Sequence, residues 1–276
     1  MRRAWPVPLL CALLLFAAGG DAAEVGDPFP AMAASYLVKL NGAILWAHDP
    51  GRPLPPASLA KMMTALLVLE RGRLDGVATA SEAASCETGT RLGLSPGDRM
   101  RVRDLLAATL LGSANDAARA LAEHVAGSEA RFVRLMNAKA RALGMRGTHF
   151  ANATGHHHPE LRSTAEDLAL LAEAALRNEV FAGLAATVRM EVRTADGRRV
   201  FTLENKNEMV GRYPGAIGVK TGYTREAGAC LVVLAERGED RALLVMLNAP
   251  NRWWDAVAML DNAFLAARRM REARRP

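Results

Sequence analysis

A serine and a lysine lie three residues apart, where they could act as a nucleophile and its base. Ser58 and Lys61 come at the start of an apolar stretch whose spacing predicts a helix from residue 57 to about residue 72. Residues three apart share one face of a helix, so the hydroxyl and the amine can meet. The start of a helix also favours negative charge. The pair therefore predicts covalent catalysis by a serine whose proton passes to an amine.

The chain's use of lysine favours this interpretation over an ordinary helix with a surface lysine. Only 5 of the 35 basic residues are lysine, so arginine supplies most of the positive charge. An amine shielded from water can lose its proton, whereas a guanidinium stays charged. Because a Ser-x-x-Lys pair also arises by chance, it carries weight only with partners elsewhere in the chain.

A second motif, Ser113-Ala114-Asn115, lies at a break between two predicted helices. Ser113 with Asp116 three residues later is also the pattern of a helix N-cap with a carboxylate that reaches back. The residues alone support the cap and a catalytic role equally. The same serine can cap the helix and take part in catalysis.

A third motif, Lys220-Thr221-Gly222, ends a predicted strand that begins at Ile217. Lys220 offers a cation and Thr221 a hydroxyl, and Gly222 leaves the strand open to another backbone. An extended peptide that ends in a carboxylate suits such an edge. Taken alone, the motif would be an ordinary strand end with an exposed lysine.

Strand patterns occur at both ends of the chain, and helical patterns lie between them. Apolar runs and alternation predict strands at 35–40, 43–47, 187–204 (a pair), 217–220, 229–235 and 242–247. Helical spacing predicts helices at 102–111, 116–125, 129–143, 164–176 and 251–270. We therefore expect an α/β (α+β) fold in which both ends of the chain build one antiparallel sheet flanked by helices. A helical subdomain, roughly residues 74–176, is inserted between the strands.

The first residues have the pattern of an export signal. Arg2 and Arg3 precede an apolar run over 7–18 and then small residues, which predicts a signal peptide at 1–22. The run is too short to span a membrane and no comparable segment follows, so no transmembrane span is expected. One domain over 23–276 would then act in the periplasm, or be otherwise secreted or associated with the cell wall.

Charge and the metal-binding residue types exclude several function classes. The net charge is +6, but the basic tail at 268–276 holds five Arg and one Glu, so the rest of the chain is near neutral. Nucleic-acid-binding proteins spread basic charge over a face, so the charge distribution argues against that function. The tail is either a solvated end or a weak anchor to anionic lipid or wall polymer. The adjacent histidines at 156–158 lack metal-site spacing, so no metal or cofactor is expected. Whether Cys86 and Cys230 form a disulfide stays open.

The three motifs, each present once and in this order, resemble a known family. The chain is similar to the low-molecular-mass penicillin-binding proteins, the serine-type D-Ala-D-Ala carboxypeptidases of peptidase family S11, which share these motifs with class A β-lactamases. The resemblance covers nearly all of the chain after the predicted signal, including the stretches at 56–64, 132–150 and 218–224. It implies a β-lactamase/transpeptidase-like fold.

The resemblance also implies catalytic roles. Ser58 would be the acylated nucleophile and Lys61 its general base, with a pKa lowered by burial and by Lys220. Ser113 would relay a proton to the leaving amine. The enzyme would cleave the terminal D-Ala–D-Ala bond of peptidoglycan stem pentapeptides and hydrolyse the acyl-enzyme. β-Lactams, which mimic that dipeptide, would acylate Ser58 and leave slowly.

Substrate-binding roles follow from the same resemblance. Asn115 would hold Lys61 and the substrate amide, and Lys220 and Thr221 would orient the terminal carboxylate. The backbone N–H groups of Ser58 and Tyr223, beside Gly222, would form the oxyanion hole. Arg252 lies where the family has an arginine that faces the same carboxylate, in a looser alignment.

The chain departs from the family in two ways. Many members have His where this chain has Tyr223, but the role assigned there uses the backbone. Larger members continue into a β-rich domain and a membrane-binding helix, whereas this sequence ends soon after the predicted helix at 251–270. In that respect it resembles the shorter members, some of which cut peptide cross-links.

Three alternatives remain. A D,D-endopeptidase that cleaves peptidoglycan cross-links would use the same motifs. A β-lactamase of the class A type needs a Glu-x-x-Leu-Asn loop, but the stretch at 159–163 lacks the Asn and the spacing, and Glu166 lies in the first turn of a predicted helix. A non-enzymatic wall-binding protein with a relic site is disfavoured, because the nucleophile, base, relay and carboxylate-binding residues are all present.

Overall fold

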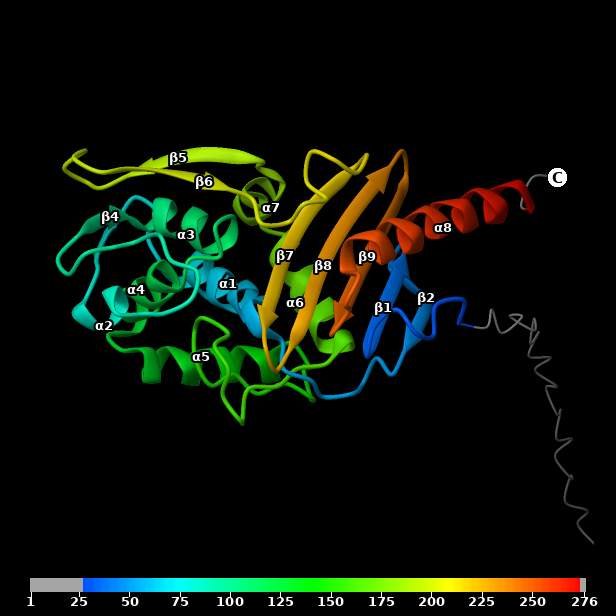
Figure 1. Cartoon of the computed structure of the whole chain (residues 1–276), viewed down its shortest axis with the longest axis horizontal. Coiled ribbons are helices and arrows are strands. Elements are labelled where there is room, and N and C mark those ends of the chain that lie inside the picture. The colour runs from blue at the N-terminus through cyan, green and yellow to red at the C-terminus, as the bar shows by residue number, and fades with distance from the viewer. Residues whose placement is uncertain (1–26, 274–276) are drawn as a thin grey trace, which may run out of the picture.

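A computed structural model describes residues 27–273 of the chain (Figure 1), so the predicted signal peptide lies outside the described residues. A five-stranded antiparallel sheet has the order β2-β1-β9-β8-β7. Its strands are β1 (Ser35–Leu40), β2 (Ala43–His48), β7 (Ala216–Thr224), β8 (Gly228–Arg237) and β9 (Asp240–Leu247). The prediction that both ends of the chain build one sheet is therefore confirmed.

Helices bury both faces of this sheet. The helix α8 (Arg252–Ala273) packs against β1, β8 and β9 on one face, and α6 (Ala165–Leu176) packs against the same strands on the other. Successive strand residues therefore enter different cores: Val232 lies with the α6 side and Val233 with the α8 side. Burial on both faces explains why these strands are continuous apolar runs.

The remaining helices lie beside the β7 edge of the sheet, and all but the shortest pack around α1 (Lys61–Arg71) (Figure 1). They are α2 (Glu82–Ser85), α3 (Val102–Leu110), α4 (Asn115–Ala126), α5 (Glu129–Ala142) and α7 (Glu179–Ala186). Two small antiparallel pairs accompany them, β3 (Val77–Thr79) with β4 (Arg99–Arg101) and β5 (Arg189–Arg193) with β6 (Val200–Glu204). The sequence patterns predicted α3 to α6 and the β5–β6 pair, but not α2, α7 or the β3–β4 pair.

The segment before α1 differs from the single helix that the sequence predicts. A 3₁₀ turn, η1 (Ala57–Ala60), comes first and α1 begins at Lys61. Ala57 has a left-handed backbone, with φ 48°, which an L-residue adopts only at some cost. The turn packs against β7 and β8, so it carries Ser58 to the edge of the sheet.

Within residues 27–273 no helix is both long enough and apolar enough to cross a membrane. Cys86 is exposed and Cys230 is buried, and both are free thiols. Glu166 lies in the first turn of α6, as the sequence predicts.

Candidate active site

The Ser58 hydroxyl and the Lys61 amine are in contact. The Lys61 Nζ lies 3.0 Å from the Ser58 Oγ, which is hydrogen-bond distance. The 3₁₀ turn that contains Ser58 lies directly before α1, and Lys61 is the first residue of that helix. The pairing expected from their spacing is therefore present, although the hydroxyl comes from the tighter turn.

Two further acceptors determine how the Lys61 amine is oriented. The Nζ atom is also 2.6 Å from the Asn115 Oδ1 and bonds the backbone carbonyl of Thr154. A neutral amine has two N–H groups and one lone pair. When both N–H groups are donated to these oxygens, the lone pair is left to face Ser58, which is the arrangement that a general base needs.

The surroundings of Lys61 favour the neutral amine. The side chain is fully buried, and this burial, together with the positive charge of Lys220, lowers the pKa of Lys61 well below its usual value. The carboxylates of Glu87 and Asp116 act in the opposite direction and are weaker influences. An amine at this position can therefore take a proton from Ser58 at a pH where surface lysines are charged.

A second amine and a second hydroxyl meet nearby. The Lys220 Nζ lies 2.9 Å from the Ser113 Oγ and 3.0 Å from the Thr221 carbonyl. Lys220 is 2 % exposed, and burial, followed by the charge of Arg252, lowers the pKa of Lys220 to about 7. Its charge therefore changes near neutral pH.

Ser113 has an unusual backbone and caps no helix. Its φ is 60°, in the left-handed region, which costs energy for a residue with a side chain. The N-cap of α4 is Ala114, with no side-chain hydrogen bond, so the cap that the sequence allowed is absent. Asp116 instead accepts hydrogen bonds from the backbone N–H groups of Leu92, Gly93 and Leu94. Ser113 is thus held apart from the helix, toward Lys220.

Two glycines allow close contact with the backbone of the nucleophile. A Cβ at Gly222 would lie 3.0 Å from both the Pro56 carbonyl oxygen and the Ser58 nitrogen. A Cβ at Gly155 would lie 2.1 Å from the Ala57 carbonyl oxygen. The backbone that Gly222 admits is therefore that of the η1 turn, which fixes Ser58 between β7 and the loop that contains Gly155.

The other predicted binding residues lie near the end of β7. Thr221 is buried, and Tyr223 is 68 % exposed. Arg252, the first residue of α8, donates a hydrogen bond to the Gly222 carbonyl at 2.8 Å and packs over the Trp253 ring. The guanidinium is thus tied to the backbone of the third motif, close enough to Lys220 to lower its pKa.

Four residues outside the motifs also belong to this arrangement. Thr154 contributes a backbone carbonyl and Gly155 a close approach, neither of which a side-chain pattern can reveal. His156 and Glu87 lie behind Asn115, whose Nδ2 is 2.9 Å from the His156 Nε2. The three adjacent histidines were a visible signal, but only the fold selects the first of them.

Two hydroxyl–amine pairs at the junction of the sheet and the helices suit acyl transfer. Ser58 with Lys61 provides an activated nucleophile, and Ser113 with Lys220 provides a route for a second proton. The buried cation also attracts a carboxylate at this junction.

Comparisons with known proteins agree with this chemistry. A family model described as D-alanyl-D-alanine carboxypeptidase, Peptidase S11, matches residues 27–251. The D-alanyl-D-alanine carboxypeptidase DacF of Bacillus subtilis (strain 168) is 37% identical over 243 residues, 85% of this chain and 62% of that protein. The D-alanyl-D-alanine carboxypeptidase DacB2 of Mycobacterium tuberculosis is 35% identical over 232 residues, 81% of this chain and 79% of that protein.

A solved structure shows the same fold. The crystal structure of the Streptomyces K15 DD-transpeptidase matches with a TM-score of 0.81 and 30% sequence identity, covering 87% of this chain and 100% of that one. The predicted transpeptidase-like fold is therefore confirmed. The chain spans 62% of the length of the Bacillus relative. On the extent of the family match, the chain belongs to the D-alanyl-D-alanine carboxypeptidase family, peptidase S11.

Proposed function

We propose that this protein is a serine-type D-Ala-D-Ala carboxypeptidase that acts on peptidoglycan stem pentapeptides. The observation that carries the proposal is the contact of the buried Lys61 amine with the Ser58 hydroxyl at 3.0 Å. Because Asn115 and Thr154 accept the amine's N–H groups, its lone pair is available to the hydroxyl.

In acylation, the Ser58 Oγ attacks the carbonyl carbon of the penultimate D-Ala while its proton passes to Lys61. The backbone N–H groups of Ser58 and Tyr223 stabilise the oxyanion of the tetrahedral intermediate. Ser113 gives its proton to the nitrogen of the leaving D-alanine and takes one from the neighbouring Lys220 ammonium. Water then attacks the ester on Ser58 and passes a proton through Ser113 to Lys220, while Lys61 returns its proton to the departing Ser58 Oγ. β-Lactams form the same ester but leave slowly.

The terminal carboxylate of the substrate binds at the end of β7. Lys220 supplies the cation and Thr221 a hydroxyl, and Gly222 lets this strand end lie against the turn that carries Ser58. The Arg252 guanidinium, which donates a hydrogen bond to the Gly222 carbonyl, adds positive charge at this end of the strand. Binding of a carboxylate stabilises the charged form of Lys220, whose pKa is about 7 in the free protein.

A β-lactamase is the less favoured function. It requires a loop Glu that activates water for deacylation, and the stretch nearest to that motif, residues 159–163, lacks its Asn and its spacing. The Glu166 Oε2 faces Gly51, at 3.7 Å from where a Cβ would be. A carboxylate in the first turn of a helix is stabilised there without a catalytic role.

We also infer that the protein is exported, because the sequence at 1–22 has the pattern of a signal peptide and the proposed substrate is outside the cytoplasm. The domain would be residues 23–276, with a helical subdomain at roughly 74–176. The basic tail could add weak attraction to an anionic surface.

Chromatography of reaction products tests the function and its main alternative. Purified protein is incubated separately with a stem pentapeptide that ends in D-Ala-D-Ala and with cross-linked wall fragments, with S58A as the control. D-alanine released from the pentapeptide by the wild type alone is the expected result. Cleavage of the cross-linked fragments without D-alanine release would identify an endopeptidase, and no cleavage of either would overturn the proposal.

A further inference from the structure

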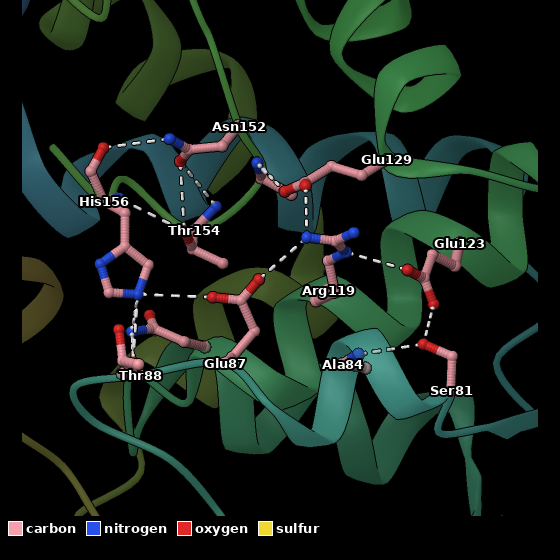
Figure 2. A network of polar contacts seen from close by, with 12 residues as sticks. Ser81, Ala84, Glu87, Thr88, Arg119, Glu123, Glu129, Asn152, Thr154 and His156 are labelled. Carbon is pink, nitrogen blue, oxygen red and sulfur yellow. Dashed lines mark hydrogen bonds and ion pairs between the residues drawn. The ribbon is translucent and has the colours of Figure 1, made fainter. Parts of the chain in front are cut away.

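A polar chain continues from Lys61 to the far side of Asn115, away from Ser58. Asn115 accepts from Lys61 through its Oδ1, and its Nδ2 lies 2.6 Å from the Thr88 carbonyl and 2.9 Å from the His156 Nε2. The same Nε2 atom is 3.1 Å from the Thr88 carbonyl and 3.4 Å from the Glu87 Oε2. Figure 2 shows the His156 ring directed at Glu87.

The His156 Nε2 therefore faces one donor and two acceptors. Without a proton, this nitrogen accepts the second N–H of the Asn115 amide, and the Asn115 Oδ1 stays turned toward Lys61. With a proton, it donates to Glu87 or Thr88 and opposes the Asn115 N–H. The amide can then relieve the opposition by turning its oxygen toward His156, which removes an acceptor from Lys61.

Glu87 is held firmly on the far side of His156. Its Oε1 is 3.1 Å from Arg119 on α4, and Arg119 also pairs with Glu123 and Glu129 (Figure 2). Glu87, through its hydrogen bond and its charge, raises the pKa of His156, whereas partial burial and the charge of Lys61 act against the increase. Arg119 neutralises part of the Glu87 charge from behind.

We propose that His156, held by Glu87, is a positioning residue that fixes the orientation of the Asn115 amide and thereby of the Lys61 amine, and that a proton on His156 slows acylation. The inference rests on the proposed function, because it assigns Lys61 the role of base. His156 touches neither Ser58 nor Lys61 within hydrogen-bond distance, so it acts through Asn115.

Two substitutions separate positioning from simple packing. H156L removes the acceptor at every pH, so we expect acylation to be about tenfold slower, as for the loss of one partly buried hydrogen bond. H156Q keeps an acceptor oxygen that cannot be protonated. It should recover most of the rate, and the decline in acylation rate on the acid side should move to lower pH.

The direction in which the acid-side decline of H156Q moves distinguishes positioning from a purely electrostatic effect. Removing a positive charge from position 156 lessens repulsion of the Lys61 cation, which would raise the pKa of Lys61. The acid-side decline would then move to higher pH, opposite to our expectation. H158Q is the matched control, because His158 is an exposed histidine of the same loop.

The experiment measures the second-order rate constant of acylation by a fluorescent penicillin as a function of pH for the wild type, H156L, H156Q and H158Q. The proposal predicts a slow H156L, a fast H156Q with its acid decline at lower pH, and an H158Q profile like the wild type. Should H156L fail to fold, the H156Q profile alone decides. An unchanged or upward-shifted H156Q profile would overturn this inference, whereas a wild type that is not acylated would overturn the proposed function.

Discussion

The Lys220 Nζ and the Ser113 Oγ lie 2.9 Å apart, although 107 residues separate them in the chain. Lys220 belongs to the edge strand of the sheet, and Ser113 to the connection between α3 and α4. Their contact therefore joins the sheet to the helical part of the molecule. The charge of Lys220 also lowers the pKa of Lys61, so this junction helps to make the proposed base available.

Replacing the proposed base by a permanent cation should abolish acylation. K61R introduces a guanidinium that stays charged and cannot take the proton of Ser58, so we expect the rate of acylation by penicillin to fall by at least about a thousandfold. The matched control is K139R, because Lys139 is a surface lysine paired with Glu70. Circular dichroism and the melting temperature establish that each variant is folded. Acylation of a folded K61R at the wild-type rate would remove Lys61 from the mechanism.

Carboxylate recognition should weaken above neutral pH. The pKa of Lys220 is about 7, so at higher pH the free protein loses the cation that attracts the substrate carboxylate. We expect the KM for a D-Ala-D-Ala peptide to increase as pH rises above about 7, up to tenfold per pH unit. A KM that stays constant across this range would contradict the role given to Lys220.

Removing Arg252 should move that dependence. The positive charge of Arg252 lowers the pKa of Lys220, so R252Q should raise it and the increase in KM should begin at higher pH. R212Q is the control, because Arg212 is exposed and paired with Glu208. Steady-state kinetics across pH gives the pH at which KM begins to rise separately from the size of the rise. An increase that begins at the same pH in R252Q and the wild type would count against this coupling.

The close approach at Gly155 should be indispensable. Gly155 and Gly144 both have left-handed backbones, with φ of 84° and 79°. A Cβ at Gly155 would lie 2.1 Å from the Ala57 carbonyl oxygen, whereas a Cβ at Gly144 would have no neighbouring atom within 4 Å. G144A should therefore cost only backbone strain of about 1 kcal/mol. G155A should lower the melting temperature further and slow acylation more than tenfold, since it displaces the turn that carries Ser58. Equal behaviour of the two variants would disprove the clash.

The buried Asp116 carboxylate should stabilise the loop between α2 and β4. It accepts backbone N–H groups of Leu92, Gly93 and Leu94, at 2.9, 2.8 and 3.0 Å. D116N places an amide N–H against these donors, and we expect it to lower the free energy of unfolding by about 1–3 kcal/mol in urea. D75N is the control, because Asp75 is exposed. A D116N protein as stable as the wild type would show that the loop does not depend on this carboxylate.

Much of the fold follows from sequence pattern. Strands buried on both faces leave continuous apolar runs, so β8 and β9 were visible in the sequence. The predicted strand at 217–220 was too short, because β7 continues through Thr224 by pairing with β8, which local hydrophobicity does not record. Sequence pattern does not predict α7, because eight residues form only about two turns and are too few for helical spacing to stand out. The 3₁₀ turn at Ser58 depends on contacts with β7 and β8 that lie far away in the chain.

Some residues of the proposed site can be recognised in the sequence, and others can be identified only from the fold. Ser58, Lys61, Ser113 and Lys220 carry side chains whose chemistry and motif order are recognisable in sequence. The Thr154 carbonyl is not, because every residue has one and only the fold decides which carbonyl reaches Lys61. Glu87 and His156 are 69 residues apart, and nothing in their neighbours predicts that they meet behind Asn115.

The intact mass of the protein after treatment with penicillin tests the central claim most directly. We predict that the wild type gains the mass of one penicillin molecule, that peptide mapping places it on Ser58, and that S58A gains none under the same conditions. A wild type of unchanged mass, or an adduct that persists in S58A, would contradict the assignment of Ser58 as the nucleophile.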